Sequence, residues 1–264
     1  MRLTAKDISV SIAGKSILSH VDVSFSEGRR TAIIGPNGAG KSTLLRVLAS
    51  LHTDYEGNVL LGETDIRRMG RKRVARHLAI LPQSMQAPPD TTVRRLVDYG
   101  RFPYRGIFAI SRPKEDREAV EWALEATHLA ELQDRQVVSL SGGERQRAWI
   151  AMALAQQPEI LLLDEPTTYL DIAHQLDVMQ IIRQVNEDHG MTVIMVLHDI
   201  NHALQYSDEI VVIKNHGIFA QGEPKDVLTV DMLAQVFGVR ADIFTNSQGI
   251  SVLSPLSIVE ETRF

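Results

Sequence analysis

The sequence predicts an α/β fold with an antiparallel β region at its N-terminus and an inserted α-helical subdomain. Two apolar runs, residues 160–163 and 192–197, each end in charged or polar side chains, as buried parallel strands do. A glycine-rich turn at residues 35–40 follows a predicted strand and precedes a predicted helix. Between residues 84 and 156 the apolar spacing is mainly helical.

The first third of the chain predicts short strands around one helix. Alternating or continuous apolar runs predict strands at residues 3–12, 17–25, 30–34 and 77–81. The spacing of Leu44, Leu45, Val47 and Leu48 is helical, and we expect that helix to end before the turn at residues 54–57.

The middle of the chain predicts helices. Pro88 and Pro89 interrupt the backbone, after which Thr91 or Thr92 is placed to cap a helix that runs to Asp98. Two longer helices are predicted over residues 115–129 and from residue 143 to about 156.

These patterns predict three units. Residues 1–83 and 157–225 form the core with its β subdomain, residues 84–156 form the helical subdomain, and residues 226–264 form a C-terminal tail.

The composition excludes several classes of protein. The formal net charge of -5 argues against coating of nucleic acid by a basic surface, because that mode of binding requires an excess of Lys and Arg. With no cysteine, the chain has no disulfide, no thiolate metal site and no cysteine nucleophile. Residues 1–12 lack the apolar core of a signal peptide, and no run approaches the roughly 20 apolar residues that span a bilayer.

The strongest local motif is a phosphate-binding P-loop, and it predicts a nucleotide site. It consists of Gly35, Pro36, Asn37, Gly38, Ala39, Gly40, Lys41, Ser42 and Thr43. Glycines let the backbone approach phosphate oxygens, and amides at a helix start direct donors at the same anion. In this motif Lys41 reaches the β and γ phosphates of ATP, and the Ser42 hydroxyl coordinates Mg²⁺.

Two carboxylates follow the apolar run at residues 160–163. Asp164 is placed to hold the Mg²⁺ shell, with water between them, and Glu165 to orient or deprotonate the attacking water. Acidic residues also follow strands merely to cap the next helix, and the upstream P-loop favours the catalytic interpretation.

A second anion-binding helix start identifies a family. Ser141, Gly142, Gly143 and Glu144 open the helix with a serine cap and two glycines. This segment resembles the signature motif of the ABC ATPases, and the resemblance covers about the first 225 residues with its motifs in the family's order. It implies a head-to-tail homodimer, in which Ser141 and Gly143 contact the γ phosphate of ATP held on the partner subunit's P-loop.

Three further positions follow from the resemblance. Gln83 resembles the lid-loop glutamine that touches Mg²⁺ and water, and Asp171 resembles the loop aspartate that links the two active sites across the dimer interface, although a helix cap is a compatible role. His198 resembles the switch histidine that hydrogen-bonds the γ phosphate. His198 and His202 have i, i+4 spacing, but a zinc site is rejected because no third ligand is evident.

One position departs from the family. An aromatic residue usually stacks on adenine, and the aligned place here is Ile12. Isoleucine packs against the base without the aromatic stacking, which contributes about 0.5–1.5 kcal/mol beyond the buried area, so we expect looser base selectivity or weaker nucleotide affinity.

Two segments indicate which kind of ABC transporter the chain resembles. Residues 96–104 and 167–175 look like those of ATPases in bacterial iron-siderophore, haem and vitamin B12 importers, and the iron-chelate systems fit best. The resemblance implies a peripheral subunit on the cytoplasmic face of the membrane, bound to an integral membrane permease and served indirectly by a substrate-binding protein.

Residues 101–108 form either part of the groove for a permease helix or a packed internal loop. A soluble ABC ATPase acting on nucleic acid or the ribosome, or a module that binds ATP without hydrolysis, is the alternative.

Overall fold

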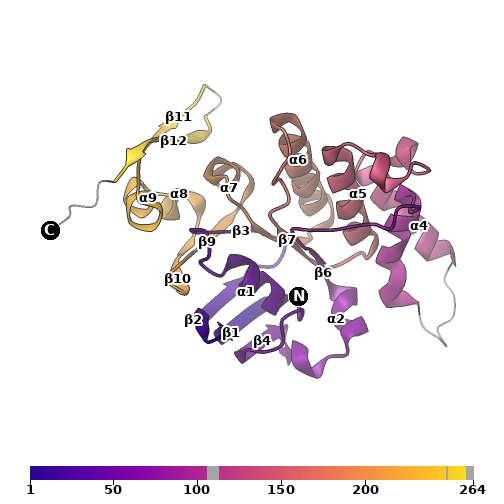
Figure 1. Ribbon diagram of the computed structural model, residues 1–264, viewed down its shortest axis with the longest axis horizontal. Helices are drawn as coiled ribbons and strands as arrows, with labels where there is room; N and C mark the ends of the chain where they lie inside the picture. The colour runs from indigo at the N-terminus through magenta and orange to yellow at the C-terminus, as the bar shows by residue number, and fades with distance from the viewer. Residues whose placement is uncertain (106–112, 248, 260–264) are drawn as a thin grey trace.

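A six-stranded sheet forms the centre of the computed structural model, which describes residues 1–105, 113–247 and 249–259 (Figure 1). Its strand order is β10(Gly217–Gly222), β9(Glu209–Lys214), β3(Arg30–Ile34), β8(Thr192–Val196), β7(Ile160–Asp164), β6(Leu78–Leu81). All neighbouring strands are parallel except β10, which is antiparallel to β9. Every residue of β7 and β8 is buried, which explains why both strands consist almost entirely of apolar residues.

A second, antiparallel sheet lies at the N-terminus. Its order is β2(Lys15–Phe25), β1(Leu3–Ile12), β4(Glu56–Leu61), β5(Thr64–Asp65). Ala13 and Gly14 connect β1 to β2 with φ of 49° and 76°, the left-handed conformation that tight hairpin turns require. The predicted antiparallel β region is therefore present.

Helices surround the central sheet (Figure 1). The α-helices are α1(Lys41–Leu48), α2(Arg71–His77), α3(Val93–Asp98), α4(Pro113–Ala126), α5(Gly142–Ala155), α6(Ile172–His189), α7(Ile200–Tyr206), α8(Pro224–Val227) and α9(Val230–Phe237). Short 3₁₀ helices are η1(Ile66–Arg68), η2(Tyr99–Tyr104), η3(Ala130–Leu132) and η4(Val137–Ser139).

The central sheet separates two hydrophobic cores. Leu162 and Ile194 face the core shared with the N-terminal sheet and α1. Leu163 and Met195, their neighbours in sequence, face the core that includes α5 and α6. This alternation follows from the pleat of a strand, and it holds the sheet edge that carries the site between two packed layers.

Most predicted elements are confirmed. Strands β1 and β3 have the predicted bounds, and Thr92 rather than Thr91 caps α3, with its hydroxyl oxygen accepting from the Arg95 amide at 3.2 Å. Residues 84–156 contain α3, α4 and α5, as predicted, although α4 ends at Ala126 rather than 129. The division into three units at residues 83, 157 and 226 stays a prediction.

The C-terminal segment is more structured than the expected tail. After α9 the chain forms the hairpin β11(Val239–Thr245) and β12(Ser251–Ile258), which extends from the upper left of Figure 1. Ala241 and Leu253 are buried, and Asn201 of α7 exchanges two hydrogen bonds with the Leu253 backbone at 2.8 and 3.1 Å. The hairpin is thus attached to the helix that follows His198.

Candidate nucleotide-binding site

The predicted P-loop connects β3 to α1, and two of its glycines are required by geometry. A Cβ at Gly35 would overlap the carbonyl oxygen of Ile213, and one at Gly40 would lie 2.8 Å from the carbonyl oxygen of Ile17. Gly40 also has φ of 99°, which L side chains rarely adopt. The loop therefore adopts a conformation that brings its backbone close to whatever occupies its concave side.

Lys41 is buried beneath this loop. Its ammonium donates to the carbonyl oxygens of Gly35 at 2.8 Å and Pro36 at 2.9 Å. Burial lowers the pKa of Lys41, and the carboxylates of Glu165 and Asp164 partly oppose that shift. A bound phosphate would supply the negative charge that this desolvated ammonium lacks.

Ser42 and Asp164 lie together, as the sequence predicts. The Ser42 hydroxyl donates to Oδ1 of Asp164 at 2.8 Å, and Asp164 is only 2% exposed. Burial raises the pKa of Asp164, although the Ser42 hydrogen bond opposes the shift. These hard oxygen ligands fit Mg²⁺, which typically takes one or two protein ligands and completes its shell with water and phosphate.

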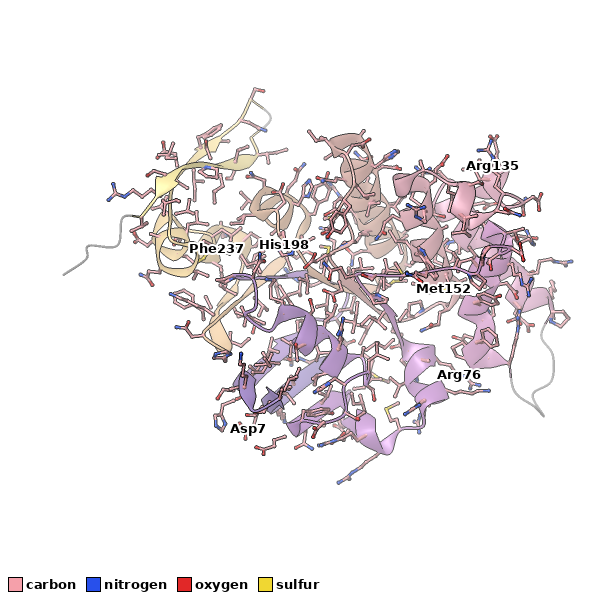
Figure 2. The ribbon with its side chains drawn as sticks, in the orientation of Figure 1. Asp7, Arg76, Arg135, Met152, His198 and Phe237 are labelled. Carbon is pink, nitrogen blue, oxygen red and sulfur yellow. The ribbon has the colours of Figure 1, made fainter. Side chains whose placement is uncertain are left out.

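Glu165 lies at the centre of a polar cluster. The Gln83 amide donates to Oε2 at 2.6 Å, the Thr168 hydroxyl donates to the same oxygen at 3.1 Å, and Nε2 of His198 lies 2.5 Å from Oε1. Figure 2 shows His198 near the middle of the molecule, between the C-terminal helices and the helical region that contains Met152. Glu165 has φ of 56°, a strained value for this residue type that often marks a functional site.

A pocket of about 250 Å³ joins the P-loop to this cluster. It is lined by Ile17, Asn37, Gly38, Ala39, Gly40, Lys41, Ser42, Thr43, Glu165 and His198. Ile12, the position aligned with the adenine-stacking aromatic, does not line the pocket and is 46% exposed at the end of β1. Ile17 was missed by sequence reasoning, because alternation along β2 identifies its face but not which residue meets the P-loop.

The signature residues lie outside that pocket. Ser141 caps α5: its hydroxyl accepts from the Glu144 amide at 3.3 Å, and Glu144 Oε2 accepts from the Ser141 amide at 2.8 Å. These hydrogen bonds lower the pKa of Glu144. Within the described chain, residues 141–144 contribute nothing to the lining of the P-loop pocket.

Asp171 and His202 also lie outside the P-loop pocket. Asp171 is exposed and caps α6, accepting from the His174 amide at 2.9 Å. His198 precedes α7, whereas His202 packs edge-on against Tyr206 with ring centroids 6.0 Å apart. Among the described residues, no group of three or more His, Cys, Asp and Glu side chains is placed to hold a metal ion.

The segment 101–108 is described only to Arg105; residues 106–108 lie outside the described residues. Arg101 is 3% exposed and pairs with Asp116 at 2.9 Å, while the Tyr104 hydroxyl donates to the Gln156 carbonyl at 3.0 Å. The described part packs against the chain through Arg101 and Tyr104 but leaves Phe102 58% exposed, so its role in a permease groove stays a prediction.

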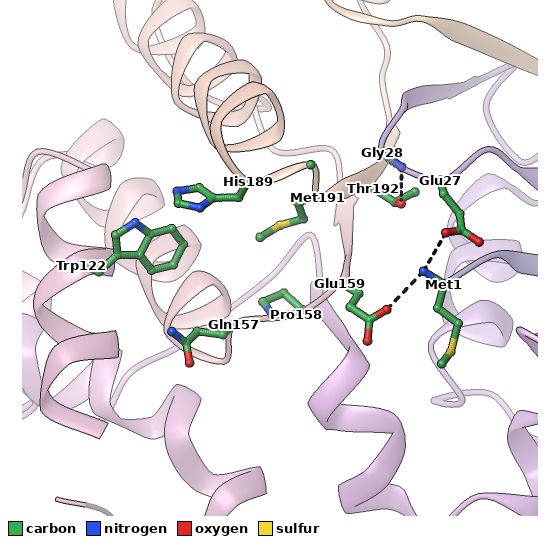
Figure 3. A pocket seen from close by; sticks show the side chains of 11 residues that line it. Met1, Glu27, Gly28, Trp122, Gln157, Pro158, Glu159, His189, Met191 and Thr192 are labelled. Atoms are coloured by element: carbon green, nitrogen blue, oxygen red, sulfur yellow. Dashed lines mark hydrogen bonds and ion pairs between the residues drawn. The ribbon is translucent and has the colours of Figure 1, made fainter. Parts of the chain in front are cut away.

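A second pocket, of about 410 Å³, shares no residue with the P-loop pocket (Figure 3). Trp122 of α4 and His189 of α6 meet edge-on inside it, with ring centroids 4.9 Å apart. Gly28 and Thr192, which come from the opposite end of strands β3 and β8, line its other side. This pocket lies where the helical segment meets the central sheet, away from the nucleotide edge.

The geometry defines a P-loop nucleotide-binding protein whose pocket is also lined by the Glu165 carboxylate. Residues 18–168 match the family model described as "ABC transporter". The chain belongs to the ABC transporter family, as an ATP-binding, ATP-hydrolysing cassette of the kind that dimerises and works with a membrane permease.

Several relatives have names that state an import function. The chain is 43% identical to the iron(3+)-hydroxamate import ATP-binding protein FhuC of Bacillus subtilis, over 92% of this chain and 90% of that protein. It is 48% identical to the petrobactin import ATP-binding protein FpuC of Bacillus anthracis, over 88% and 85%. It is 42% identical to the ferric enterobactin transport ATP-binding protein FepC of Escherichia coli, over 97% and 94%.

Solved structures agree with the fold. A chain of an ABC transporter in an inward-facing conformation gives a TM-score of 0.83 at 25% identity, over 97% of both chains. A dimeric post-hydrolysis cassette, MJ0796 bound to ADP and Pi, gives 0.73 at 28% identity, over 84% of this chain and 98% of that one.

Proposed function

We propose that this chain hydrolyses ATP to power import of a ferric siderophore through a separate membrane permease. The observation that carries the proposal is the polar cluster around Glu165 at the P-loop pocket, in a chain whose relatives are named for hydroxamate, petrobactin and enterobactin import. Import of haem or vitamin B12 is the second candidate, supported by 37% identity to the cobalamin import ATP-binding protein BtuD of Halobacterium salinarum, over 97% of this chain and 64% of that protein.

The P-loop pocket binds the phosphates of ATP in this proposal. Backbone amides at the start of α1 donate to phosphate oxygens, and Lys41 exchanges its carbonyl partners for the β and γ phosphates. Ser42 and Asp164 hold Mg²⁺, Asp164 through water, with Gln83 as a further contact. When bound, Mg²⁺ neutralises negative charge that develops on the phosphates.

Glu165 acts as the general base or orienting group for the attacking water, and His198 hydrogen-bonds the γ phosphate. Glu165 and His198 both line the pocket that holds Lys41, and Gln83 reaches Glu165. A carboxylate in this place needs only one water between itself and the γ phosphate. Movement of His198 from Glu165 to phosphate would release Oε1 for that water.

The complete site requires a homodimer. In this proposal Ser141, Gly142, Gly143 and Glu144 contact ATP on the partner's P-loop, as the resemblance to the ABC ATPases implies. These four residues do not line the chain's own P-loop pocket. Asp171 lies at the dimer interface and reaches toward the other site. Dimerisation by ATP then follows from differential affinity, since the closed dimer surrounds the nucleotide on both sides.

A third pocket supports a docking site for the permease. It has a volume of about 410 Å³ and is lined by Ala49, Ser50, Leu51, Thr53, Arg71, Val74, Ala75, Leu78, Ile80 and Gln156. Leu51, in the lining of this pocket, is 62% exposed, and Gln156 caps the end of the signature helix α5. A permease helix seated here would contact both the core and α5, so that closure of the dimer is transmitted to the membrane.

The proposal places the subunit peripherally on the cytoplasmic face of the membrane. Across the described residues, no helix combines the length and apolar character that crossing a bilayer requires. A substrate-binding protein delivers cargo to the permease on the other side, and nucleic acid is not a partner.

Uptake by cells distinguishes the cargo candidates. A strain lacking this chain is supplied with radiolabelled ferric hydroxamate, ferric catecholate, haem or cobalamin, with the wild-type chain or Glu165→Gln restored. Uptake of a ferric siderophore that requires wild type and fails with Glu165→Gln supports the proposal. Dependence confined to haem or cobalamin would favour the second candidate.

A further inference from the structure

His174, for which the sequence gives no role, lies directly against the signature motif. A Cβ built on Gly143 would lie 2.5 Å from Nδ1 of the His174 imidazole and 2.7 Å from Cδ2. The ring therefore packs on the α-carbon of Gly143, and it occupies the space that any larger residue would need. His174 is partly buried, in the first turn of α6.

This packing explains the glycine. Gly143 is buried in the first turn of α5 and does not have a positive φ, so its backbone conformation would accept alanine. Glycine loses more backbone freedom on folding than alanine does, so a helix ordinarily favours alanine over glycine. The close imidazole supplies a reason, within this single chain, why glycine occupies position 143.

A second pair continues the contact between α5 and α6. Arg147, one turn after Gly143, forms an ion pair with Asp177, which lies one turn after His174. The arginine side chain is 15% exposed and the aspartate 28%. Side chains three or four residues apart share one face of a helix, so the two pairs fix the rotation of α5 relative to the start of α6.

The start of α6 is also connected to Glu165. Its cap, Asp171, accepts from the amide of His174, and Gln175 donates to the carbonyl oxygen of Leu170 at 2.9 Å. The backbone between Glu165 and Asp171 is short, and it is anchored at one end by the Thr168 hydrogen bond to Glu165. His174 follows Asp171 by only three residues, so a displacement of this loop would also move the His174 ring.

We infer that His174 is a positioning residue that couples the chain's own ATP site to its signature motif. The inference rests on the proposed function, because the signature motif acts on the ATP of the partner subunit. Glu165 responds to ATP on its own P-loop, the 165–171 segment moves the start of α6, and the imidazole moves Gly143 with it. Each subunit thereby aligns its signature motif for the partner's ATP according to its own nucleotide state.

The test measures ATP-dependent dimerisation of the full chain in a Glu165→Gln background, in which hydrolysis is suppressed. His174→Ala leaves a gap beside Gly143, and we expect about a ten-fold increase in the ATP concentration for half-maximal dimerisation, the size typical of a coupled pair of residues. His174→Phe restores a flat ring and should return that concentration to within about three-fold of the parent. His189→Ala, at the other end of α6, is the matched control and should leave it unchanged.

Two further measurements separate positioning from a fold defect. The affinity of the monomeric subunit for a fluorescent ATP analogue and the melting temperature should match the parent for His174→Ala. In the hydrolysing background, the Hill coefficient for ATP should fall toward one in His174→Ala and recover in His174→Phe.

The inference is overturned if His174→Ala dimerises at the parent's ATP concentration, or if His174→Phe is no better than His174→Ala. Failure of the Glu165→Gln parent to dimerise at saturating ATP would instead contradict the proposed function.

Discussion

Nε2 of His198 lies 2.5 Å from Oε1 of Glu165, while the Gln83 amide donates to Oε2 of the same carboxylate at 2.6 Å. Both oxygens of the proposed catalytic base are therefore engaged by side chains from two other segments. Oε2 already accepts hydrogen bonds from Gln83 and Thr168, whereas Oε1 has one partner, so we expect the attacking water to approach Oε1, the oxygen that faces His198. The γ phosphate of ATP is a suitable new acceptor for His198, so nucleotide binding would release the base.

Glu165→Gln should retain ATP binding and accumulate an ATP-bound dimer while turnover falls by about 100-fold or more, the usual contribution of a general base. The amide keeps the size of the carboxylate but does not accept the water's proton. Steady-state ATPase assays and size-exclusion chromatography with ATP measure the two effects. Lys41→Ala is the control: it should already fail to bind ATP, because it loses the ammonium that contacts the phosphates. Normal turnover by Glu165→Gln would show that Glu165 is not the catalytic base.

Asp164→Asn should abolish Mg²⁺-dependent hydrolysis and at the same time raise the melting temperature at neutral pH. Burial raises the pKa of Asp164, so its ionised form destabilises the folded state. Asparagine still accepts the Ser42 hydrogen bond without the charge. A rise of about 2–4 °C corresponds to roughly 1 kcal/mol in a large domain.

The effect of Asp164→Asn on the melting temperature should depend on pH. Destabilisation by Asp164 develops as the pH rises from the ordinary aspartate value of 3.8 through the raised pKa, so the difference in melting temperature should disappear below that window. Mg²⁺-dependent ATP binding by the wild-type chain should weaken as the pH falls through the same window. A melting temperature of Asp164→Asn equal to or below that of wild type at neutral pH would contradict the assignment.

The P-loop, Asp164 and Glu165 were predicted from motif spacing and from their place after predicted strands, and Gln83 from resemblance to the ABC ATPases. The structure brings these residues together, while their catalytic roles stay predictions. The sequence also predicted the buried strands β7 and β8, whose continuous apolar runs leave little alternative. These features depend on local sequence, which is why they could be predicted without a structure.

Contacts between segments that are distant in the sequence could not be predicted from it. Ile17 reaches the nucleotide pocket through the way β2 crosses the P-loop, and His174 reaches Gly143 through the packing of two helices. The C-terminal hairpin was also missed, since its strands are mostly exposed and its anchor is a side chain, Asn201, from a different element. Pairwise packing of this kind leaves no periodic signal in one sequence.

Leu51→Glu should weaken association with the permease without changing the affinity of the free subunit for ATP. Leu51 lines the third pocket, is 62% exposed and does not line the nucleotide pocket. A charge there would have to be desolvated against an apolar permease helix. Co-purification with the permease measures the effect, and Leu256→Glu, at an equally exposed site on β12, is the control; equal yields for both variants would exclude this docking site.

Asn201→Asp should loosen the C-terminal hairpin by about 1–3 kcal/mol, because the new carboxylate has no donor for the Leu253 carbonyl oxygen. Hydrogen exchange of residues 239–258 should accelerate, while exchange in β7 and β8 stays slow. Asn215→Asp, in the exposed turn between β9 and β10, serves as the control. Unchanged exchange in the hairpin would show that the Asn201 amide does not anchor it.

The most direct test of the central claim is ATP hydrolysis by the subunit reconstituted with an iron-chelate permease in lipid vesicles, with and without binding protein loaded with ferric siderophore. The account predicts that the permease and the loaded binding protein together stimulate hydrolysis, and that Glu165→Gln eliminates the stimulated rate. A rate that is the same with and without permease and loaded binding protein, from a subunit that is active alone, would contradict the importer function.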